Sequence, residues 1–301
     1  MDWDHLRVFL AVARQGQLLA AARRLGLNHA TVARRLDALE EALGAPLFDR
    51  RPAGCVPTEA GERLLPAAER VEAEMLGIAE GFRDAAADVS GTVRIGAPDG
   101  LGNYFLAAEL GALTALYPDL VVELVPLPRT FSLSRREADL AIVLDRPMEG
   151  RLLVSRLIDY TLSVYAARAY LDRHGTPMSV NDLAGHVVVT GVEDLAYASA
   201  LDYSGVLEKH GRSRFRCASV MGQMEAVRAG AGIGVLHDFA AGRHLEAQGP
   251  DALVRILPGI GFRRSYFLLA HPDTAQVRRI AVLRDVLAQR FRAERARFII
   301  P

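Results

Sequence analysis

The first residues suited to chemistry lie in a short segment that begins at Asn28. Asparagine is a favoured N-cap, so a helix is predicted from residue 29 onward. One side of this helix is an apolar stripe that must be buried: Val32, Leu36, Leu39 and Leu43. The opposite side presents small and basic residues: Ala30, Thr31 and Arg34, with Arg35 at its flank. Such a face has the chemistry to contact DNA rather than to catalyse a reaction.

A shorter predicted helix ends at Gly26, and together the two helices have the helix-turn-helix pattern. In that pattern the first residues of the second helix lie against base edges in the major groove. We expect Ala30, Thr31 and Arg34 to face bases, and Asn28, His29 and Arg35 to face the sugar-phosphate backbone. For this stretch taken alone, an ordinary surface hairpin of two helices is the alternative.

The residues that follow favour a wing. Residues 46–57 are typical of two short strands around a Pro/Gly turn. Arg50 and Arg51 lie next to that turn and are placed to contact phosphates. Residues 1–58 are therefore predicted to form a winged helix-turn-helix domain. Because basic residues only slightly outnumber acidic ones here, two copies of the domain would be needed for strong binding.

A long helix is predicted from Thr58, which caps it, to about residue 88. Apolar residues alternate four and three positions apart along it: Leu64, Ala68, Val71, Met75, Ile78 and Phe82. This seam favours a homodimer formed through residues 59–88, although it could instead dock on the chain's own domain. Pro66 is expected to kink the helix near its start.

From residue 92 onward, predicted strands and helices alternate, which indicates a parallel sheet with crossover helices. Strands are expected at residues 93–97, 120–125, 140–144, 155–166, 187–189, 215–218, 234–236, 253–257 and 265–270. Helices are expected at residues 103–117 and 276–295, with a helical turn near 133–138. The region is longer than one small sheet requires. We therefore predict an α/β domain of two lobes, with a cleft between them, over residues 91–301.

Polar residues and glycines at the ends of these strands form a second group of candidates. Ligands of open α/β sheets lie beyond the carboxyl ends of the strands. That rule selects Asp99, Gly100, Leu101, Asp145, Arg146, Thr190, Gly191, Ser219, Val220 and Gln223. Turn formation or helix capping is the alternative for each polar member. His237 follows a strand and could line the same cleft, although a capping or surface position is favoured.

The charge of the expected ligand is a separate question. Ser219 lies at the start of a helix, where a hydroxyl and free N–H groups suit a carboxylate. Two carboxylates in the cleft, Asp99 and Asp145, would repel an anion unless Arg146 or Arg129 compensates.

Composition excludes several other classes of protein. Thirty-six basic side chains balance thirty-six acidic ones, so no global field would steer the protein to nucleic acid. Cys55 and Cys217 are the only cysteines and lie in different predicted domains, too few for a disulfide framework or a four-cysteine zinc site. No secretory signal and no membrane span is visible, so a cytoplasmic protein without membrane contact is expected.

No enzymatic motif is found either. The glycine-rich residues 228–234 precede a predicted strand, whereas a dinucleotide-binding fingerprint must follow one. Nucleophile-elbow, phosphate-loop and metal-spaced histidine motifs do not occur. We therefore expect no catalytic residues, no metal and no cofactor.

Several motifs, taken as a set, resemble those of the LysR-type transcriptional regulators. They are Phe9-x-x-Val12-Ala13, Ala21-Ala22-x-x-Leu25-Gly26-Leu27, residues 28–36, Leu39-Glu40-x-x-Leu43-Gly44-x-x-Leu47-Phe48-x-Arg50, and Thr58-x-Ala60-Gly61. The resemblance spans essentially the whole chain. It implies a winged helix-turn-helix, a dimerising linker helix and an effector domain folded like a periplasmic binding protein. It also implies a homotetramer on DNA and a pocket for a small, often anionic metabolite.

The chain departs from that family pattern in both helices of the helix-turn-helix. Gln17 and Leu19 stand where serine or threonine is frequent, so the second helix is expected to lack its usual cap. Ala33 replaces a hydroxyl that could contact a phosphate, and His29 could supply such a contact instead. These changes leave the fold prediction intact but alter which bases would be read.

The sequence thus predicts an α+β protein of several domains that binds double-stranded DNA and regulates transcription in response to a small-molecule effector. The alternative is an architectural DNA-binding protein whose C-terminal domain only oligomerises. A solute-binding protein with a fused interaction helix is disfavoured because no export signal is visible.

Overall fold

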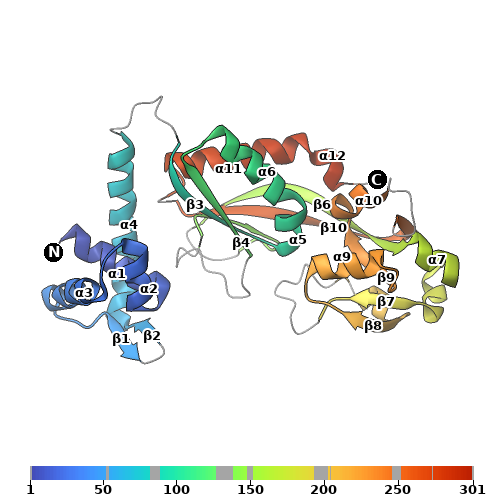
Figure 1. Ribbon diagram of the computed structural model, residues 1–301, viewed down its shortest axis with the longest axis horizontal. Helices are drawn as coiled ribbons and strands as arrows, with labels where there is room; N and C mark the ends of the chain where they lie inside the picture. Colours follow the sequence, from blue (N-terminus) through green and yellow to red (C-terminus); the bar gives the residue numbers. More distant parts are fainter. Residues whose placement is uncertain are drawn as a thin grey trace.

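Three helices and a two-stranded hairpin form the N-terminal end of the chain (Figure 1). They are α1 (Trp3–Gln15), α2 (Leu18–Leu25), α3 (His29–Leu43), β1 (Phe48–Arg51) and β2 (Gly54–Pro57). The computed structural model describes residues 2–51, 54–81, 89–126, 138–147, 152–192, 203, 205–245, 252–272 and 274–299. As predicted, α1 and α2 end at Gly16 and Gly26, both left-handed at φ 64°.

The hydrophobic core of this unit contains most of the predicted stripe of α3. Val32, Leu36 and Leu39 are completely buried, whereas Leu43 is exposed because it lies at the last position of the helix. Phe9 of α1 packs against Phe48 of β1 with ring centroids 5.3 Å apart. The wing is therefore fixed to the same core as the helices.

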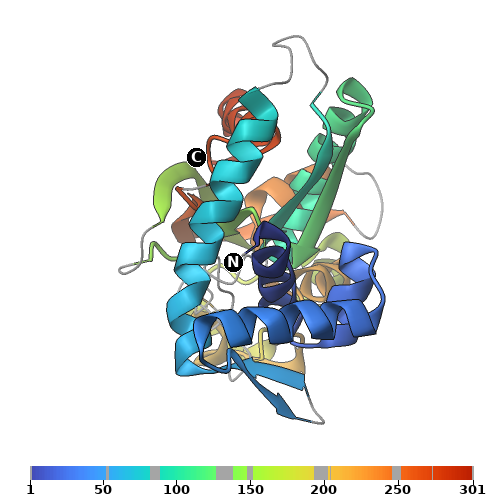
Figure 2. The same ribbon diagram turned by 90° about the vertical axis from the view of Figure 1, so that its left-hand side faces the viewer.

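The long helix α4 (Glu59–Gly81) follows the wing and runs past α3 (Figure 2). Thr58 caps it as predicted, because its hydroxyl oxygen accepts a hydrogen bond from the Gly61 amide at 3.1 Å. The helix is continuous through Pro66. Its predicted extension to residue 88 lies outside the described residues.

The rest of the chain is built on one eight-stranded sheet, ordered β4-β3-β5-β10-β6-β9-β7-β8. The first lobe contains three parallel strands: β3 (Gly91–Ala97), β4 (Leu120–Pro126) and β5 (Leu140–Val143). The second lobe contains three more: β7 (Val187–Thr190), β8 (Arg212–Arg216) and β9 (Ile233–His237). Predicted strand 215–218 begins and ends earlier in the structure, so residues 217–219 form the turn into the next helix.

Two long antiparallel strands, β6 (Leu153–Ala167) and β10 (Leu253–Ala270), run through both lobes (Figure 1). The prediction of a purely parallel sheet is therefore wrong, and so is the division of β10 into two strands. Pro258 and Gly259 lie between the two predicted strands. The chain instead accommodates them in a register shift between Ile256 and Gly261, where Leu257 is left-handed at φ 49°.

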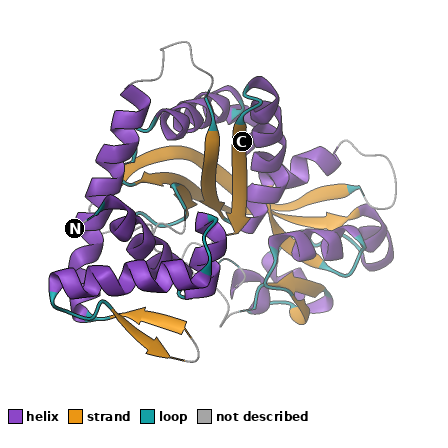
Figure 3. Ribbon diagram, turned by 60° about the vertical axis from the view of Figure 1, so that its left-hand side comes forward, coloured by secondary structure: helices purple, strands orange, loops and turns teal. Residues whose placement is uncertain are grey.

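Helices cover the strands of this sheet (Figure 3). They are α5 (Asp99–Leu101), a π segment (Gly102–Leu106), α6 (Ala107–Leu116), α7 (Arg168–His174), a 3-10 segment (Val180–Gly185), α8 (Gly205–Glu208), α9 (Val220–Arg228), α10 (Asp238–Leu245), α11 (Arg278–Ala293) and α12 (Arg295–Phe298). The helix predicted from residue 103 already begins at Asp99. The turn predicted near residues 133–138 falls almost entirely outside the described residues.

The C-terminal helix packs as its sequence pattern predicts. Ile280, Leu283, Leu287 and Phe291 of α11 are all buried, and they belong to the one hydrophobic cluster that joins the two lobes. No helix among the described residues is long and apolar enough to cross a membrane.

Candidate functional site

The first candidate site is the N-terminal end of α3. The Asn28 side chain caps this helix by accepting a hydrogen bond from the Thr31 amide at 2.7 Å. His29 and Ala30 are exposed beside it, and Thr31 is partly exposed. This end of α3 therefore presents a small, open face above the buried stripe, as the helix-turn-helix pattern requires.

The two arginines of α3 have different surroundings. Arg35 is partly buried, and its Nη1 lies 3.2 Å from Oδ2 of Asp4 on α1. Arg34 is exposed and forms no ion pair with any residue that the structure describes. Arg34 is thus available to a partner, whereas Arg35 also holds α3 against α1.

The two wing arginines are both exposed, but they differ in their partners within the protein. Nη2 of Arg50 donates hydrogen bonds to Asp37 and, at 2.9 Å, to Glu40, and both carboxylates belong to α3. Burial alone would lower the pKa of Arg50, but these two carboxylates outweigh it and raise the pKa. Arg50 is therefore paired with α3 although its side chain is 37% exposed, and its contact with a phosphate stays a prediction. Arg51 remains exposed and pairs only with its neighbour Asp49 among the described residues.

Glu40 completes the connection between the wing and α3. Its Oε1 accepts hydrogen bonds from the amides of Leu47 at 2.7 Å and Phe48 at 3.2 Å. Because its other oxygen accepts from Arg50, one carboxylate fixes both the start and the middle of β1. No sequence pattern indicated this role.

The seam of α4 divides into two parts. Ala68 is buried in the N-terminal core and Leu64 packs against it, so this part docks on the chain's own domain. Farther along, Val71, Met75 and Ile78 are 39%, 40% and 56% exposed in the single chain. The second part is an apolar stripe without a partner within the described residues, which we call the α4 stripe.

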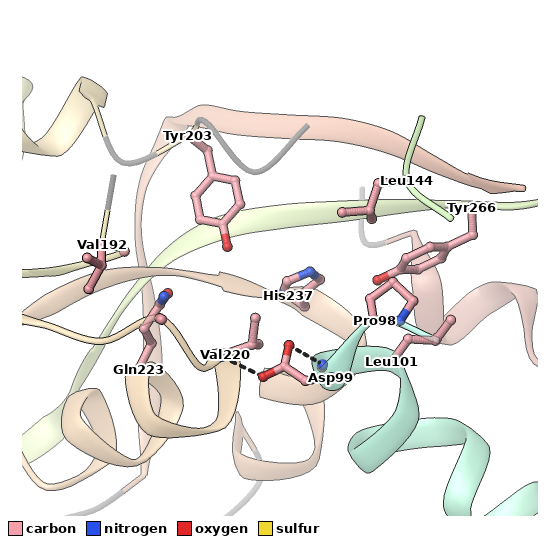
Figure 4. Close-up of a pocket in the computed structure, with 13 residues that line it drawn as sticks. Pro98, Asp99, Leu101, Leu144, Val192, Tyr203, Val220, Gln223, His237 and Tyr266 are labelled. Carbon is pink, nitrogen blue, oxygen red and sulfur yellow. Dashed lines mark hydrogen bonds between the residues drawn. The ribbon is translucent and has the colours of Figure 1, made fainter. Parts of the chain in front are cut away.

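The second candidate site is a cavity of about 60 Å³ between the two lobes (Figure 4). We call it the inter-lobe cavity. Its wall is formed by Pro98, Asp99, Gly100, Leu101, Leu144, Gly191, Val192, Tyr203, Ala218, Val220, Gln223, His237 and Tyr266. Most of these residues follow the carboxyl ends of the parallel strands, where ligands of α/β sheets bind.

Asp99 joins the two lobes at the bottom of this cavity. Its Oδ1 accepts a hydrogen bond from the Gly100 amide at 2.8 Å, and its Oδ2 accepts from the Ser219 hydroxyl and the Val220 amide, both at 3.1 Å. Ser219 and Val220 begin α9 in the second lobe. The lobes approach so closely here that a Cβ at Gly100 would lie 2.9 Å from a methyl carbon of Val220.

An aromatic cluster lies across the cavity from Asp99 (Figure 4). The His237 ring stacks on Tyr160 at 5.4 Å, and Tyr160 stacks in turn on Tyr266 at 4.2 Å. His237 is 3% exposed, and its Nδ1 has no hydrogen-bond partner among the described residues. Burial lowers the pKa of His237 to about 4, so the ring is uncharged at neutral pH.

Burial also determines the charge of Tyr203, a tyrosine of the cavity wall. Burial, with a smaller contribution from the Asp99 charge, raises the pKa of Tyr203 to about 12. Its phenol therefore remains protonated. Gln223 donates from Nε2 to the carbonyl oxygen of Cys217 at 2.7 Å, which fixes its side chain against the turn before α9.

Six of the ten predicted effector residues line the cavity: Asp99, Gly100, Leu101, Gly191, Val220 and Gln223. Thr190 and Ser219 lie beside it without entering its wall. Asp145 and Arg146 are exposed and also lie outside the wall, because Leu144 fills the position where β5 ends. Arg129 lies outside the described residues. The start of α9, where an anion was expected, is occupied by the Asp99 carboxylate.

The sequence interpretation missed the other residues of the wall. The favoured surface position for His237 is wrong, since its ring is buried inside the cavity. Pro98, Leu144, Val192 and Ala218 also follow strand ends, but their apolar side chains carry no chemical signal. Tyr203 comes from a connecting segment and Tyr266 from an antiparallel strand, so the strand-end rule could not select them.

Two family models match this chain. "Bacterial regulatory helix-turn-helix protein, lysR family" matches residues 3–62, and "LysR substrate binding domain" matches residues 86–292. Among curated proteins, the transcriptional regulator PtxR of Pseudomonas aeruginosa is 28% identical over 264 residues, which cover 86% of this chain and 83% of PtxR.

Solved structures have the same fold. A full-length variant of OxyR from Pseudomonas aeruginosa has a TM-score of 0.72 at 19% identity, covering 97% of this chain and 95% of that one. Full-length LysG from Corynebacterium glutamicum, solved with its bound effector Arg, has a TM-score of 0.64 at 19% identity and covers 96% and 97%.

Proposed function

The chain belongs to the LysR family of transcriptional regulators, and from that membership we propose which of its residues bind DNA and which bind the effector. Like other members, it is a DNA-binding regulator whose C-terminal domain senses a small molecule. Ala30, Thr31 and Arg34 contact operator bases, and Asn28, His29, Arg35 and Arg51 contact the DNA backbone. Arg50 ties the wing to α3 and, with a side chain that is 37% exposed, is also proposed to reach the DNA backbone. The observation that carries this assignment is the open N-terminal end of α3, whose Arg34 has no partner among the described residues.

We further propose that two chains associate through the α4 stripe. The chain then consists of a DNA-binding domain over residues 1–58, a dimerisation helix over 59–88 and an effector domain over 91–301. Two such dimers form a homotetramer on neighbouring sites, and the protein acts in the cytoplasm, where bacterial DNA lies. Dimerisation supports binding because each winged domain then contributes one half-site.

The effector is proposed to bind in the inter-lobe cavity. An apolar protein cavity of about 150 Å³ accepts benzene, so the present volume of about 60 Å³ is too small for most metabolites. We infer that the described conformation is a closed one and that a larger effector binds when the lobes move apart. An effector that prefers the open state shifts the equilibrium between the two states by its differential affinity. The effector Arg bound to LysG supports this use of the domain.

Replacing Arg34 by alanine tests the DNA-binding assignment. The Arg34→Ala variant should lose about 1–3 kcal/mol of operator binding, which is the usual contribution of a side chain that reads a base. Binding is measured at fixed salt by fluorescence anisotropy, with duplexes from the region upstream of the protein's own gene. Arg212→Ala, which removes an exposed arginine from the effector domain, serves as the matched control. Equal operator affinity of the two variants would show that Arg34 does not contact bases.

A further inference from the structure

The charges of the inter-lobe cavity indicate the class of effector that it accepts, given the proposed function of this cavity. Asp99 is the only acidic residue in its described wall, and no lysine or arginine belongs to that wall. Arg146, one of the two cations predicted to compensate, is exposed outside the wall. An anionic effector would therefore meet one negative charge and no positive charge among the described residues of the wall.

The usual site for an anion is also occupied already. Helix N-termini attract anions through their free N–H groups. At α9 the Val220 amide donates to Asp99, and the Gly222 amide faces the Ser219 hydroxyl oxygen at 3.5 Å. The chain thus supplies its own carboxylate to this helix, and an anionic effector would first have to displace it.

Asp99 retains capacity for a donor from a ligand. Oδ2 accepts two hydrogen bonds, whereas Oδ1 accepts only the one from the Gly100 amide among the described contacts. A carboxylate has about four acceptor positions in total. One position on Oδ1 therefore remains, and this oxygen lies on the side of the carboxylate that faces the cavity (Figure 4).

The opposite side of the cavity suits N–H donors as well. Tyr203, Tyr266 and His237 line it, and the phenol oxygens of the two tyrosines point toward the cavity (Figure 4), where a phenol oxygen can accept a hydrogen bond. His237 in addition has a buried Nδ1 without a partner among the described residues. An unpaired buried polar atom is unfavourable, so this nitrogen independently points to a ligand that forms a hydrogen bond with it.

We propose that the effector is a cation with N–H donors, of the ammonium, amidinium or guanidinium type. Its charged group binds Oδ1 of Asp99 and donates to the phenol oxygens of Tyr203 and Tyr266, while another polar atom pairs with Nδ1 of His237. Asp99 thereby determines specificity. It holds the lobes together through α9 in the closed state and receives the positive charge of the effector in the bound state.

Two sets of probes with matched shapes test this charge preference in the full-length protein. Acetamidinium, acetamide and acetate form the small set, and benzamidinium, benzamide and benzoate the larger one. Thermal unfolding and titration calorimetry are run at equal ionic strength. In each set the cation should bind about tenfold more tightly than the neutral amide, because it adds one charge pair in a partly buried site. The anion should not bind measurably.

The Asp99→Asn variant should abolish this preference, so that the amidinium and the amide bind equally within about threefold, because the charge is lost while the side-chain shape is kept. Asp145→Asn removes an exposed carboxylate near the same strand ends and should keep the preference. Unfolding midpoints of the ligand-free variants show whether each one folds. The ranking of the three probes on the unmodified protein needs no variant and decides the proposal alone if Asp99→Asn is unstable.

The outcomes separate this proposal from the function on which it rests. Tighter binding of the anion, or equal binding of all three probes, overturns the charge assignment and leaves effector sensing intact. No binding by any probe overturns both the charge assignment and the use of this cavity. DNA binding by the same preparation, measured in parallel, is independent of all these results.

Discussion

His237 shows how one buried side chain makes the effector domain sensitive to mild acid. Its pKa is about 4 in the fold because burial penalises the charged ring, whereas an unfolded histidine has a pKa near 6.5. Between these values the unfolded chain binds more protons than the folded one. The contribution of His237 to the free energy of unfolding is therefore fully present above pH 6.5, and it is lost as the pH falls toward 4.

We expect this residue to remove on the order of 2 kcal/mol of stability between pH 7 and pH 5. Urea unfolding at the two pH values measures the loss in the unmodified protein and in His237→Gln, whose amide cannot be protonated. The pKa of His186 is lowered too, chiefly by burial, and it contributes equally to both proteins. If both lose the same stability, His237 is not the group responsible.

At the scale of secondary structure, the side chain of Asn28 caps α3, the helix that we propose to read DNA. Replacing Asn28 by alanine removes the acceptor for the Thr31 amide and should cost about 1 kcal/mol of unfolding free energy. Asn28→Ser keeps an acceptor oxygen and is the matched control, with a loss of only a few tenths. Urea unfolding monitored by helical signal makes the comparison. Equal stability of the two variants would show that the cap contributes nothing.

The same elements show how far sequence reasoning reaches. The three N-terminal helices, the wing strands and the cap at Thr58 follow local rules, because glycines, caps and apolar spacing act within a few residues of one another. Six cavity residues were found because the strand-end rule depends only on the order of elements along the chain.

Contacts between distant residues could not be predicted in this way. The pairing of Arg50 with Asp37 and Glu40 depends on how the wing folds back on α3. The position of Asp99 at the start of α9 joins residues 120 positions apart in the chain. The continuity of β10 across Pro258 and Gly259 depends on its neighbour β6, which lies about a hundred residues earlier.

At the scale of the whole molecule, the α4 stripe is the surface through which we propose that two chains associate. Ile78 is the most exposed of its three residues at 56%, and an aspartate there would place a charge in the proposed interface. Ile78→Asp should therefore shift the protein from dimer to monomer in sedimentation analysis. Binding to an inverted repeat should fall by about tenfold or more, because two linked half-sites add their binding free energies, while binding to one half-site stays unchanged.

The two strands β6 and β10 both run from one lobe to the other, so any movement of the lobes has to bend this pair. Their pairing is irregular between Ile256 and Gly261 and again between Tyr266 and Phe267. Because a bulge interrupts the ladder of hydrogen bonds and bends its strand, we expect the lobes to pivot at these two places.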